Sequence, residues 1–367
     1  MIKKTVMAFI AIMLISCTSV PVPSEQEIPS NQNQISEIIL WDAIGQEVVL
    51  PETPSRIVIA GIQTPMIVNL FYLFYEAKDA IVAIENRSQS INNFLIYVDD
   101  TGENKMQIEK GANAEQIAPL KPDLVILKSS MKEQVGDTLH EINIPVFYLG
   151  LENIEEIYKD IENIGEILNN SSRAEEIIAF YQERELFIES RMRGIEREKY
   201  PSVLLLQCKS AQDEISFEVP PANWLQTNMV EMAGGLPVWT NSTLGSGWTG
   251  VNFEQIAAWD ADIILFVSYF SDPTEILTIL KENSAWQQLK AIENNQIYGF
   301  PGDFISWDQP DPRWILALQW LAKTFHPEIF SDLSITDEII TFYEFMYGIP
   351  ESKTQGEILP MVKGSLY

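Results

Sequence analysis

Residues 113–127 of the chain read NAEQIAPLKPDLVIL, and residues 252–266 repeat this pattern as NFEQIAAWDADIILF, 139 positions later. The asparagine, the Glu-Gln-Ile-Ala run and a later aspartate recur in register. Each copy predicts a short helix with an asparagine cap, a turn, and an apolar run typical of a buried parallel strand. Because the same unit occurs in each half, we expect two similar lobes rather than one large core.

Apolar runs outside the repeat predict further buried strands. They lie at 56–61, 80–84, 145–149, 203–207 and 296–300. Helical segments separate them, a pattern that implies parallel pairing with right-handed crossovers. Residues 37–50 instead predict a hairpin, with Gly45 supplying a positive φ in its turn. The predicted fold class is therefore α/β, with two Rossmann-like lobes.

Residues 154–195 contain no strand pattern and no proline. Ile177, Tyr181, Ile188 and Met192 fall on one helical face of this stretch. A helix of ~20 residues spans about 30 Å, the breadth of a small domain. We therefore expect one long helix to join the lobes, with a ligand cleft between them and only modest closure. The alternative is an ordinary surface helix within one lobe.

These patterns predict the organisation of the whole chain. The expected parts are a targeting segment at 1–17, a disordered tether at 18–36, an N-terminal lobe at 37–153, a helical connector at 154–199, a C-terminal lobe at 200–350 and a loosely held tail at 351–367. Within the second lobe, Asp311 is predicted to cap a helix whose first position is Pro312.

Composition and charge narrow the possible partners. The chain has 367 residues, 46% of them hydrophobic, and a formal net charge of −28. So acidic a protein repels phosphates, which excludes nucleic acid as a partner. The two cysteines are Cys17 and Cys208. If Cys17 carries lipid, no intrachain disulfide can form, and Cys208 is expected to be a small core residue.

The N-terminus has the features of a targeting segment. Lys3 and Lys4 precede an apolar run at 6–15 that is too short to remain as a membrane span. Leu14-Ile15-Ser16-Cys17 resembles the lipobox of bacterial lipoproteins, in which the cysteine becomes the lipid-modified N-terminus. The resemblance implies lipidation of Cys17 and an extracytoplasmic location at a membrane. The alternative is an ordinary secretion signal that contains a cysteine.

The mature part of the chain resembles the substrate-binding proteins of bacterial ABC importers, in the class with two α/β lobes joined by one long helix. The markers are WDAIGQEVVLPETPSRIV at 41–58, NAEQIAPLKPDLVI at 113–126, MVEMAGG at 229–235, NFEQIAAWDADIIL at 252–265 and WDQPDPRWILALQWLAKTFHPE at 307–328. Members of this class carry iron–siderophore complexes, haem, corrinoids, divalent metals or molybdate-like oxyanions. The order of the markers is typical of the family, but it does not identify the ligand.

The resemblance implies a function and a set of partners. We expect a lipid-anchored binding protein that captures an iron complex, either a siderophore or haem, and delivers it to an ABC permease. A corrinoid or a molybdate- or tungstate-type oxyanion is the alternative ligand. No intrinsic cofactor is expected, and the protein is expected to be a monomer.

In this class, one glutamate of each lobe docks on arginines of the permease. Glu115 and Glu254, the glutamates of the two Glu-Gln-Ile-Ala runs, match this role. Exposed carboxylates early in a helix are stabilised by its dipole and can meet cations on a partner. The alternative is that both are merely first-turn helix residues.

Ligands of open α/β sheets bind beyond the carboxyl ends of the strands. The residues placed there by the predicted strands are Gln63, Arg87, Lys128, Lys209, Trp248, Tyr269, Trp307 and Asp308. The aromatic rings could stack on a planar or bulky ligand. The cations could meet carboxylate, phosphate or an oxyanion, although each alone could be a solvated surface charge. Core packing is the alternative for the rings, and it is the expected role of Phe270 and Phe304.

Other functions lack support in the sequence. His140 and His326 are the only histidines, and neither belongs to a pattern with metal-ligand spacing, so no metal site is expected. No nucleophile elbow, phosphate loop or HExxH motif occurs, which leaves an extracytoplasmic hydrolase as a distant alternative. A structural or adhesive surface lipoprotein is a third possibility, and it would show no ligand-dependent fluorescence change.

Overall fold

The computed structural model describes residues 37–87, 93–101, 105–211, 214–242, 245 and 247–366. The predicted targeting segment, Cys17 and the tether therefore lie outside the described residues. Within the described ranges we find no helix that combines the length and the apolar composition needed to span a bilayer.

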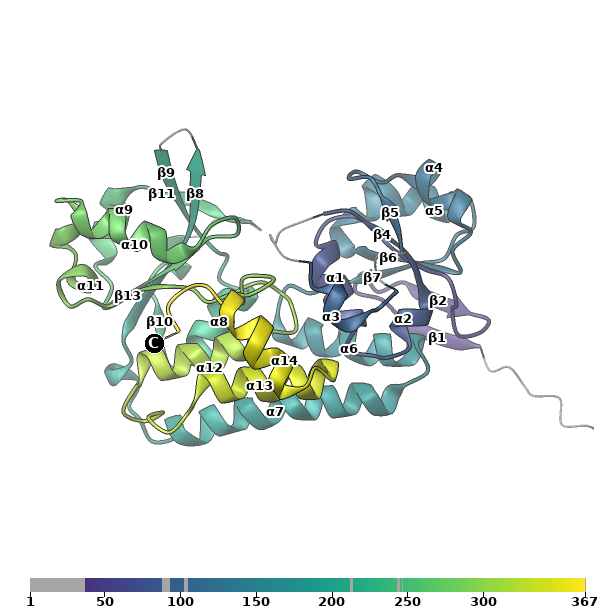
Figure 1. The fold of residues 1–367 in the computed structure, drawn as a ribbon. Helices are drawn as coiled ribbons and strands as arrows, with labels where there is room; N and C mark the ends of the chain where they lie inside the picture. The colour runs from purple at the N-terminus through teal and green to yellow at the C-terminus, as the bar shows by residue number, and fades with distance from the viewer. Residues whose placement is uncertain are drawn as a thin grey trace, which may run out of the picture. The chain divides into compact units, whose positions relative to one another are not determined.

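A parallel sheet of five strands forms the core of the first half, in the order β5-β4-β3-β6-β7 (Figure 1). The strands are β3 (Ile57–Ile59), β4 (Ile81–Glu85), β5 (Met106–Ile108), β6 (Leu124–Lys128) and β7 (Val146–Leu149). All residues of β3, β6 and β7 are buried, as expected for strands covered on both faces. The helices of this half are α1 (Thr64–Phe71), α2 (Ala77–Ala80), α3 (Leu95–Val98), α4 (Ala114–Ile117) and α5 (Asp137–Glu141).

The predicted hairpin is confirmed. Strands β1 (Ile38–Trp41) and β2 (Glu47–Leu50) pair antiparallel. The turn contains Gly45 at φ 75°, and the Asp42 carboxylate accepts hydrogen bonds from the amides of Ile44 and Gln46. The turn conformation thus follows from a glycine and a local aspartate.

The second half contains a mixed sheet, ordered β11-β9-β8-β12-β13, with β10 paired to β8. Its strands are β8 (Ser202–Ala211), β9 (Glu214–Val219), β10 (Leu236–Pro237), β11 (Thr249–Val251), β12 (Ile263–Val267) and β13 (Ile297–Gly299). Strands β8, β12 and β13 are parallel, whereas β9 and β11 run antiparallel to their neighbours. Strands β5, β9, β10 and β11 were not predicted from the sequence.

The repeated sequence forms the same unit in both halves. Asn113 accepts a 3.1 Å hydrogen bond from the Gln116 amide, and Asn252 accepts a 2.9 Å bond from the Gln255 amide. The asparagines therefore cap α4 and α9 (Phe253–Trp259) as predicted. Each helix leads into a central strand: β6 lies between β3 and β7, and β12 between β8 and β13. The predicted duplication of a helix-turn-strand unit is confirmed.

The stretch predicted as one long helix consists of two. These are α6 (Ile154–Ile167) and the 22-residue α7 (Ser171–Met192). Asn169 adopts a left-handed φ of 55°, and Asn170 caps α7 by accepting a hydrogen bond from the Arg173 amide. A left-handed residue ends α6 because it cannot continue a right-handed helix. A single connecting helix is therefore not confirmed.

Helices of the second half pack around α12 (Trp314–Phe325), which contacts α7, α8 (Leu225–Met232) and α13 (Ile335–Tyr347) (Figure 1). The remaining helices are α10 (Pro273–Glu282), α11 (Lys290–Glu293) and α14 (Glu351–Lys353). Asp311 does not cap α12, because this helix begins at Trp314 with Arg313 as its N-cap. Asp311 accepts hydrogen bonds from the Arg313 amide and guanidinium instead.

The tail after Pro350 is more ordered than predicted. Thr354 and Ile358 are fully buried, and the Ser365 hydroxyl accepts a 3.0 Å hydrogen bond from the Gly299 amide. The Ser365 carbonyl accepts a bond from the Trp320 indole at 2.6 Å. The tail is thus held by β13 and α12, although its sequence lacks the length of apolar pattern that would have predicted this.

Leu225 and Arg173 donate hydrogen bonds to parts of the chain that lie far away in sequence. The Leu225 amide, at the start of α8, donates a 2.9 Å hydrogen bond to the Glu152 carbonyl, between β7 and α6. Arg173 on α7 donates from Nε to the Leu73 carbonyl at 3.0 Å and from Nη2 to the Phe345 carbonyl at 2.8 Å. These bonds satisfy carbonyls that helix ends and turns would otherwise leave unpaired.

Candidate functional site

Loops at the carboxyl end of the first sheet converge on the carboxylate of Glu85, which is 1% exposed. Its Oε2 accepts a 2.6 Å hydrogen bond from the Gly61 amide, in the loop after β3. Its Oε1 accepts from Arg87 Nε at 2.6 Å and from the Gly111 amide, after β5, at 2.9 Å. Hydrogen bonds to this one side chain thus connect the loops after β3, β4 and β5, at the edge where open α/β sheets bind ligands.

The carboxylate of Asp308 has a comparable place at the second sheet. Its Oδ2 accepts hydrogen bonds from the Tyr269 hydroxyl at 3.0 Å and from Gln226 Nε2 at 3.3 Å. Its Oδ1 accepts a 2.6 Å bond from the Ser306 hydroxyl. Asp308 is fully buried, and burial raises its pKa to about 6 although all three donors oppose this. The ion pairs of the described chain include none for this carboxylate.

The Tyr269 hydroxyl therefore donates a hydrogen bond to Asp308, so the ring does not project freely from its loop. Burial, and then the carboxylates of Asp308 and Glu218, raise the pKa of Tyr269 well above its usual value. The phenol is consequently a neutral hydrogen-bond donor at physiological pH. The geometry brings two of the predicted ligand residues, Tyr269 and Asp308, into direct contact.

Lys128 does not have the position expected of a ligand-binding cation. Its side chain is 1% exposed, and Nζ donates to the Gly150 carbonyl and forms a 2.8 Å ion pair with Glu152. These groups follow β7, so the ammonium holds the loop between β7 and α6. A buried ammonium with local partners has no surface on which to meet a ligand, and the predicted role of Lys128 does not fit this geometry.

The other two predicted cations also have carboxylate partners. Arg87 pairs with Glu85 at 2.6 Å, and Lys209 pairs with Glu218 at 2.6 Å. The Arg87 side chain is 20% exposed and that of Lys209 52% exposed, so both remain at the protein surface. Each cation is therefore neutralised within its own half before any ligand arrives.

The aromatic residues separate into core and surface groups. Trp307 and Phe304 are 0% and 1% exposed. The predicted ligand contact of Trp307 thus does not fit the geometry, whereas the core role of Phe304 is confirmed. Trp248 is half-buried and packs edge-on against Trp224, with ring centroids 5.9 Å apart. Phe270, predicted to be core, is instead 77% exposed because it follows the buried end of β12 in a surface loop.

Gln63 and Gln207, near the ends of the two sheets, are among the described residues that have a buried polar atom without a hydrogen-bond partner. Gln63 has a left-handed φ of 58° at the start of α1, and its Oε1 is buried and accepts no hydrogen bond. Gln207, near the end of the predicted apolar strand in β8, is 5% exposed, and its Oε1 likewise has no donor. Gln207 was not among the predicted site residues, although a polar residue that ends the run Val-Leu-Leu-Leu is a signal in the sequence.

Glu115 and Glu254 occupy matching places on the repeated unit. Each lies in the first turn of its helix, α4 or α9, and both side chains are exposed. Exposure of both carboxylates is required for docking on a permease but equally suits a plain first-turn role. The docking assignment therefore stays a prediction.

In the described part of the chain, neither the two histidines nor Cys208 has the surroundings of a reactive or metal-binding residue. His326 is buried, with Nε2 3.0 Å from the Gly234 carbonyl, and burial lowers its pKa. His140 is exposed. Burial raises the pKa of the half-buried Cys208, which makes its thiol unreactive. Among the residues described, we find no group of three or more His, Cys, Asp or Glu side chains able to hold a metal ion.

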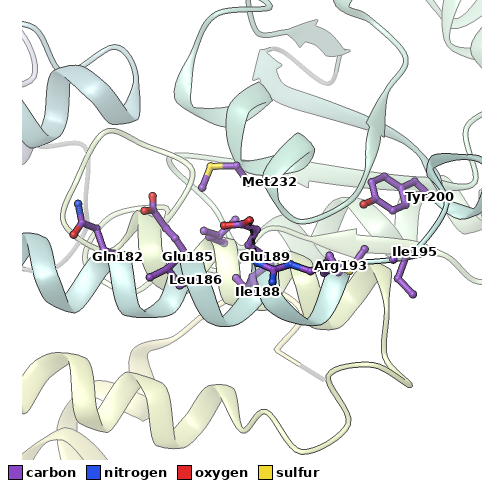
Figure 2. A pocket seen from close by; sticks show the side chains of 12 residues that line it. Gln182, Glu185, Leu186, Ile188, Glu189, Arg193, Ile195, Tyr200 and Met232 are labelled. Carbon is purple, nitrogen blue, oxygen red and sulfur yellow. Dashed lines mark ion pairs between the residues drawn. The ribbon is translucent and has the colours of Figure 1, made fainter.

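A surface hollow of about 770 Å³ lies along α7 (Figure 2). Figure 2 shows Glu185 and Glu189 of α7, and Arg193 directly after this helix, at the hollow together with Met232 and Tyr200. Burial raises the pKa of the Glu185 carboxyl. None of the residues predicted to bind ligand lines this hollow, so it is separate from the loops at the ends of the sheets.

Comparison with known proteins identifies the class of this chain. The sequence model of the family described as periplasmic binding protein matches residues 80–304, more than half of the chain. A periplasmic solute-binding protein from Veillonella parvula has a solved structure with a TM-score of 0.70 and 26% identity, covering 87% of this chain and 96% of that one.

Two curated relatives have known ligands in their names. Molybdate-binding protein MolA of Haemophilus influenzae is 20% identical over 85% of this chain and 92% of its own length. The haem uptake protein IsdE of Staphylococcus aureus is 24% identical over 51% of this chain and 62% of its own length. The chain thus spans less than two thirds of IsdE but nearly all of MolA.

The chain belongs to the periplasmic binding protein family, in the class of ABC-importer substrate-binding proteins with two α/β lobes. Its mixed α/β fold, with one sheet in each half, agrees with the two-lobe neighbours. Proteins of this family work outside the cytoplasm and deliver small molecules to ABC permeases. They are transport proteins, and this family membership is the argument against an enzyme.

Proposed function

We propose that this protein captures a bulky metal complex, an iron complex of the siderophore or haem type, and delivers it to an ABC permease. The main support for a bulky ligand is the exposed aromatic ring of Phe270. This residue directly follows Tyr269, whose hydroxyl is held by its hydrogen bond to Asp308. An apolar ring 77% exposed on a binding loop favours contact with a large, partly apolar ligand.

Several residues of the second sheet support this placement. Trp248 and Trp224 form an edge-on pair at half-buried positions, and Tyr269 is held by Asp308. Rigid rings bind with little loss of side-chain entropy, which suits a site that must hold a ligand firmly until delivery. In the first half, Gln63 offers a free carbonyl oxygen and Arg87 a surface guanidinium fixed by Glu85.

A corrinoid or a molybdate-type oxyanion is the second candidate ligand. Its support is the alignment with MolA, which covers 92% of that protein's length. An oxyanion is small and needs several convergent donors. The three predicted cations of this site already have carboxylate partners, which favours the bulky complex instead.

We also propose that Glu115 and Glu254 dock on the permease, and that Cys17 carries the lipid that holds the protein at the membrane. The first part is supported by the equal, exposed positions of the two glutamates. The lipid anchor is supported by the Leu-Ile-Ser-Cys sequence at 14–17. Changing Cys17 to Ala should release the protein from the membrane fraction, and unchanged retention would contradict the anchor.

Fluorescence titration tests the ligand class directly, because the chain contains nine tryptophans. The panel is a ferric trihydroxamate, a ferric triscatecholate, haem, a corrinoid and molybdate. We expect saturable one-to-one quenching by an iron complex at micromolar concentration or below. Binding of molybdate alone, or of none of the five, would overturn the proposal.

A further inference from the structure

We infer that the ligand of the second sheet's site is neutral or positively charged and donates hydrogen bonds to acceptors at Gln207 and Glu218, next to the buried pair of Tyr269 and Asp308. This inference rests on the proposed function, since it names the charge class of the metal complex. It excludes multiply anionic complexes and inorganic oxyanions.

The first observation is the arrangement of the acceptors. Gln207 pairs with Glu218 on β9 and with Val267 on β12. Side chains of paired residues lie on the same face of a sheet, so Gln207 and Glu218 share one face. Val267 shares it too, and Tyr269 follows two positions later. Tyr269 then contacts Asp308 through its hydroxyl. Because the Glu218 carboxylate also raises the pKa of Tyr269, the two carboxylates and the Gln207 amide form one cluster around this ring.

The second observation is an unpaired acceptor within this cluster. Gln207 is 5% exposed, and its Oε1 has no hydrogen-bond donor in the described chain. A buried polar atom without a partner costs about 1–3 kcal/mol, so its retention calls for an explanation. A ligand group that donates a hydrogen bond would satisfy it.

The third observation is the charge balance of the loops. Arg87, Lys128 and Lys209 are each paired with a carboxylate, at 2.6, 2.8 and 2.6 Å. Lys110, after β5, is exposed and has Glu109 beside it. Asp308 has only neutral donors: a phenol, an amide and a hydroxyl. The described loops thus carry surplus negative charge, which opposes an anion and favours a cation.

A matched series of ligands separates charge from shape. The probes are one ferric trihydroxamate chelate with a terminal amine, its N-acetyl form and its N-succinyl form, which differ in charge but share the metal core. We expect the amine to bind at least as tightly as the acetyl form, and the succinyl form about tenfold or more weakly. Added salt should weaken binding of the amine form more than that of the acetyl form.

Two variants test whether the preference for the amine form depends on Gln207. Gln207→Met keeps the side chain's size but removes the acceptor, so it should weaken the amine form several-fold. Gln207→Glu adds a negative charge and should widen the preference for the amine over the succinyl form. Gln182→Glu, the same charge change at an exposed position on α7, is the control and should leave the preference unchanged.

The outcomes distinguish this inference from the proposed function. Succinyl binding as tight as amine binding overturns the charge class while the metal-complex function stands. If both Gln207 variants prefer the amine form over the succinyl form as strongly as the wild type does, the assignment of the cluster is overturned. Failure of all three chelates to bind overturns the inference, and the proposed function falls with it only if the triscatecholate and haem also fail to bind.

Discussion

The side-chain amide of Asn69 donates a 2.6 Å hydrogen bond to the Asp311 carboxylate, although 242 positions separate the two residues. Asn69 lies on α1, and Asp311 precedes α12. The other oxygen of Asp311 accepts a 2.8 Å bond from the buried guanidinium of Arg313. The guanidinium also pairs with Asp303 at 3.0 Å and lies over the Phe94 ring. This buried cluster thus connects elements from both halves of the chain.

Removal of the Asn69 amide should weaken this connection. Asn69→Ala leaves one oxygen of a buried carboxylate without its donor, so we expect the free energy of unfolding to fall by about 1–3 kcal/mol. Urea denaturation measures the change. Asn294→Ala, at an exposed position, is the control. Equal stability of the two variants would show that water or a rearranged side chain replaces the Asn69 contact.

Glu85→Gln tests whether one carboxylate orders the loops of the first sheet. The amide cannot accept all three hydrogen bonds and leaves Arg87 without its partner, so stability should fall by about 2–4 kcal/mol. Hydrogen exchange at the Gly61 and Gly111 amides should accelerate. Glu109→Gln, on an exposed residue in the same region, is the control. Unchanged protection of both glycine amides would contradict the role of Glu85.

Two tryptophans should respond differently to truncation. Trp307→Ala opens a cavity at a fully buried position and should cost about 3–5 kcal/mol of stability. Trp248→Ala removes a half-buried ring and should leave folding largely intact while it weakens ligand binding tenfold or more. Thermal unfolding and the fluorescence titration measure the two effects. Ligand affinity that survives Trp248→Ala would remove this ring from the site.

The docking proposal makes a prediction about transport rather than binding. Glu115→Ala combined with Glu254→Ala should abolish uptake in cells while the purified protein binds its ligand normally. Glu133→Ala with Glu275→Ala removes the same charge from two other exposed helix positions and is the control. Normal uptake in the first double variant, or equal loss in the control, would refute the assignment.

Asp160 should make stability depend on pH. Its carboxylate accepts hydrogen bonds from the amides of Gly150 and Leu151 at 2.9 and 3.0 Å. Burial nevertheless raises its pKa from 3.8 to about 7. The folded state therefore binds this proton more tightly than the unfolded state, and the contribution of Asp160 to stability falls as pH rises through this window.

Comparison with Asp160→Asn isolates this effect. The stability of the wild type relative to the variant should decline by a few kcal/mol between about pH 4 and pH 7 and level off above. Urea denaturation of both proteins across this range gives the difference. A wild type that gains stability relative to the variant over the same range would show that the hydrogen bonds and Lys128 outweigh burial.

Strands that are buried on both faces could be predicted from sequence, because uninterrupted apolar runs such as residues 124–127 of β6 need no tertiary information to be recognised. Strand β9 was missed since its polar residues, among them Ser216 and Glu218, interrupt the apolar pattern. The break between α6 and α7 depends on the left-handed Asn169. Its signal, two asparagines followed by two serines, was available as a capping pattern.

The candidate site was less predictable than the fold. The repeat placed Glu115 and Glu254 at equal, exposed positions because helix caps are local features. Trp307 and Lys128 could not be separated from true surface residues, because their burial depends on how distant segments cover them. The partners of Lys128, Gly150 and Glu152, lie more than twenty positions away and come close only through the pairing of β6 with β7.

The hydrogen bond from the Leu225 amide to the Glu152 carbonyl uses main-chain atoms alone. Substitution at either position can change what surrounds the bond but cannot delete its donor or acceptor, except that proline at 225 would remove the N–H. A junction of this kind tolerates extensive sequence drift. Homologues could therefore exchange nearly every neighbouring side chain, and so acquire new cargo, while the join between residues 152 and 225 endures.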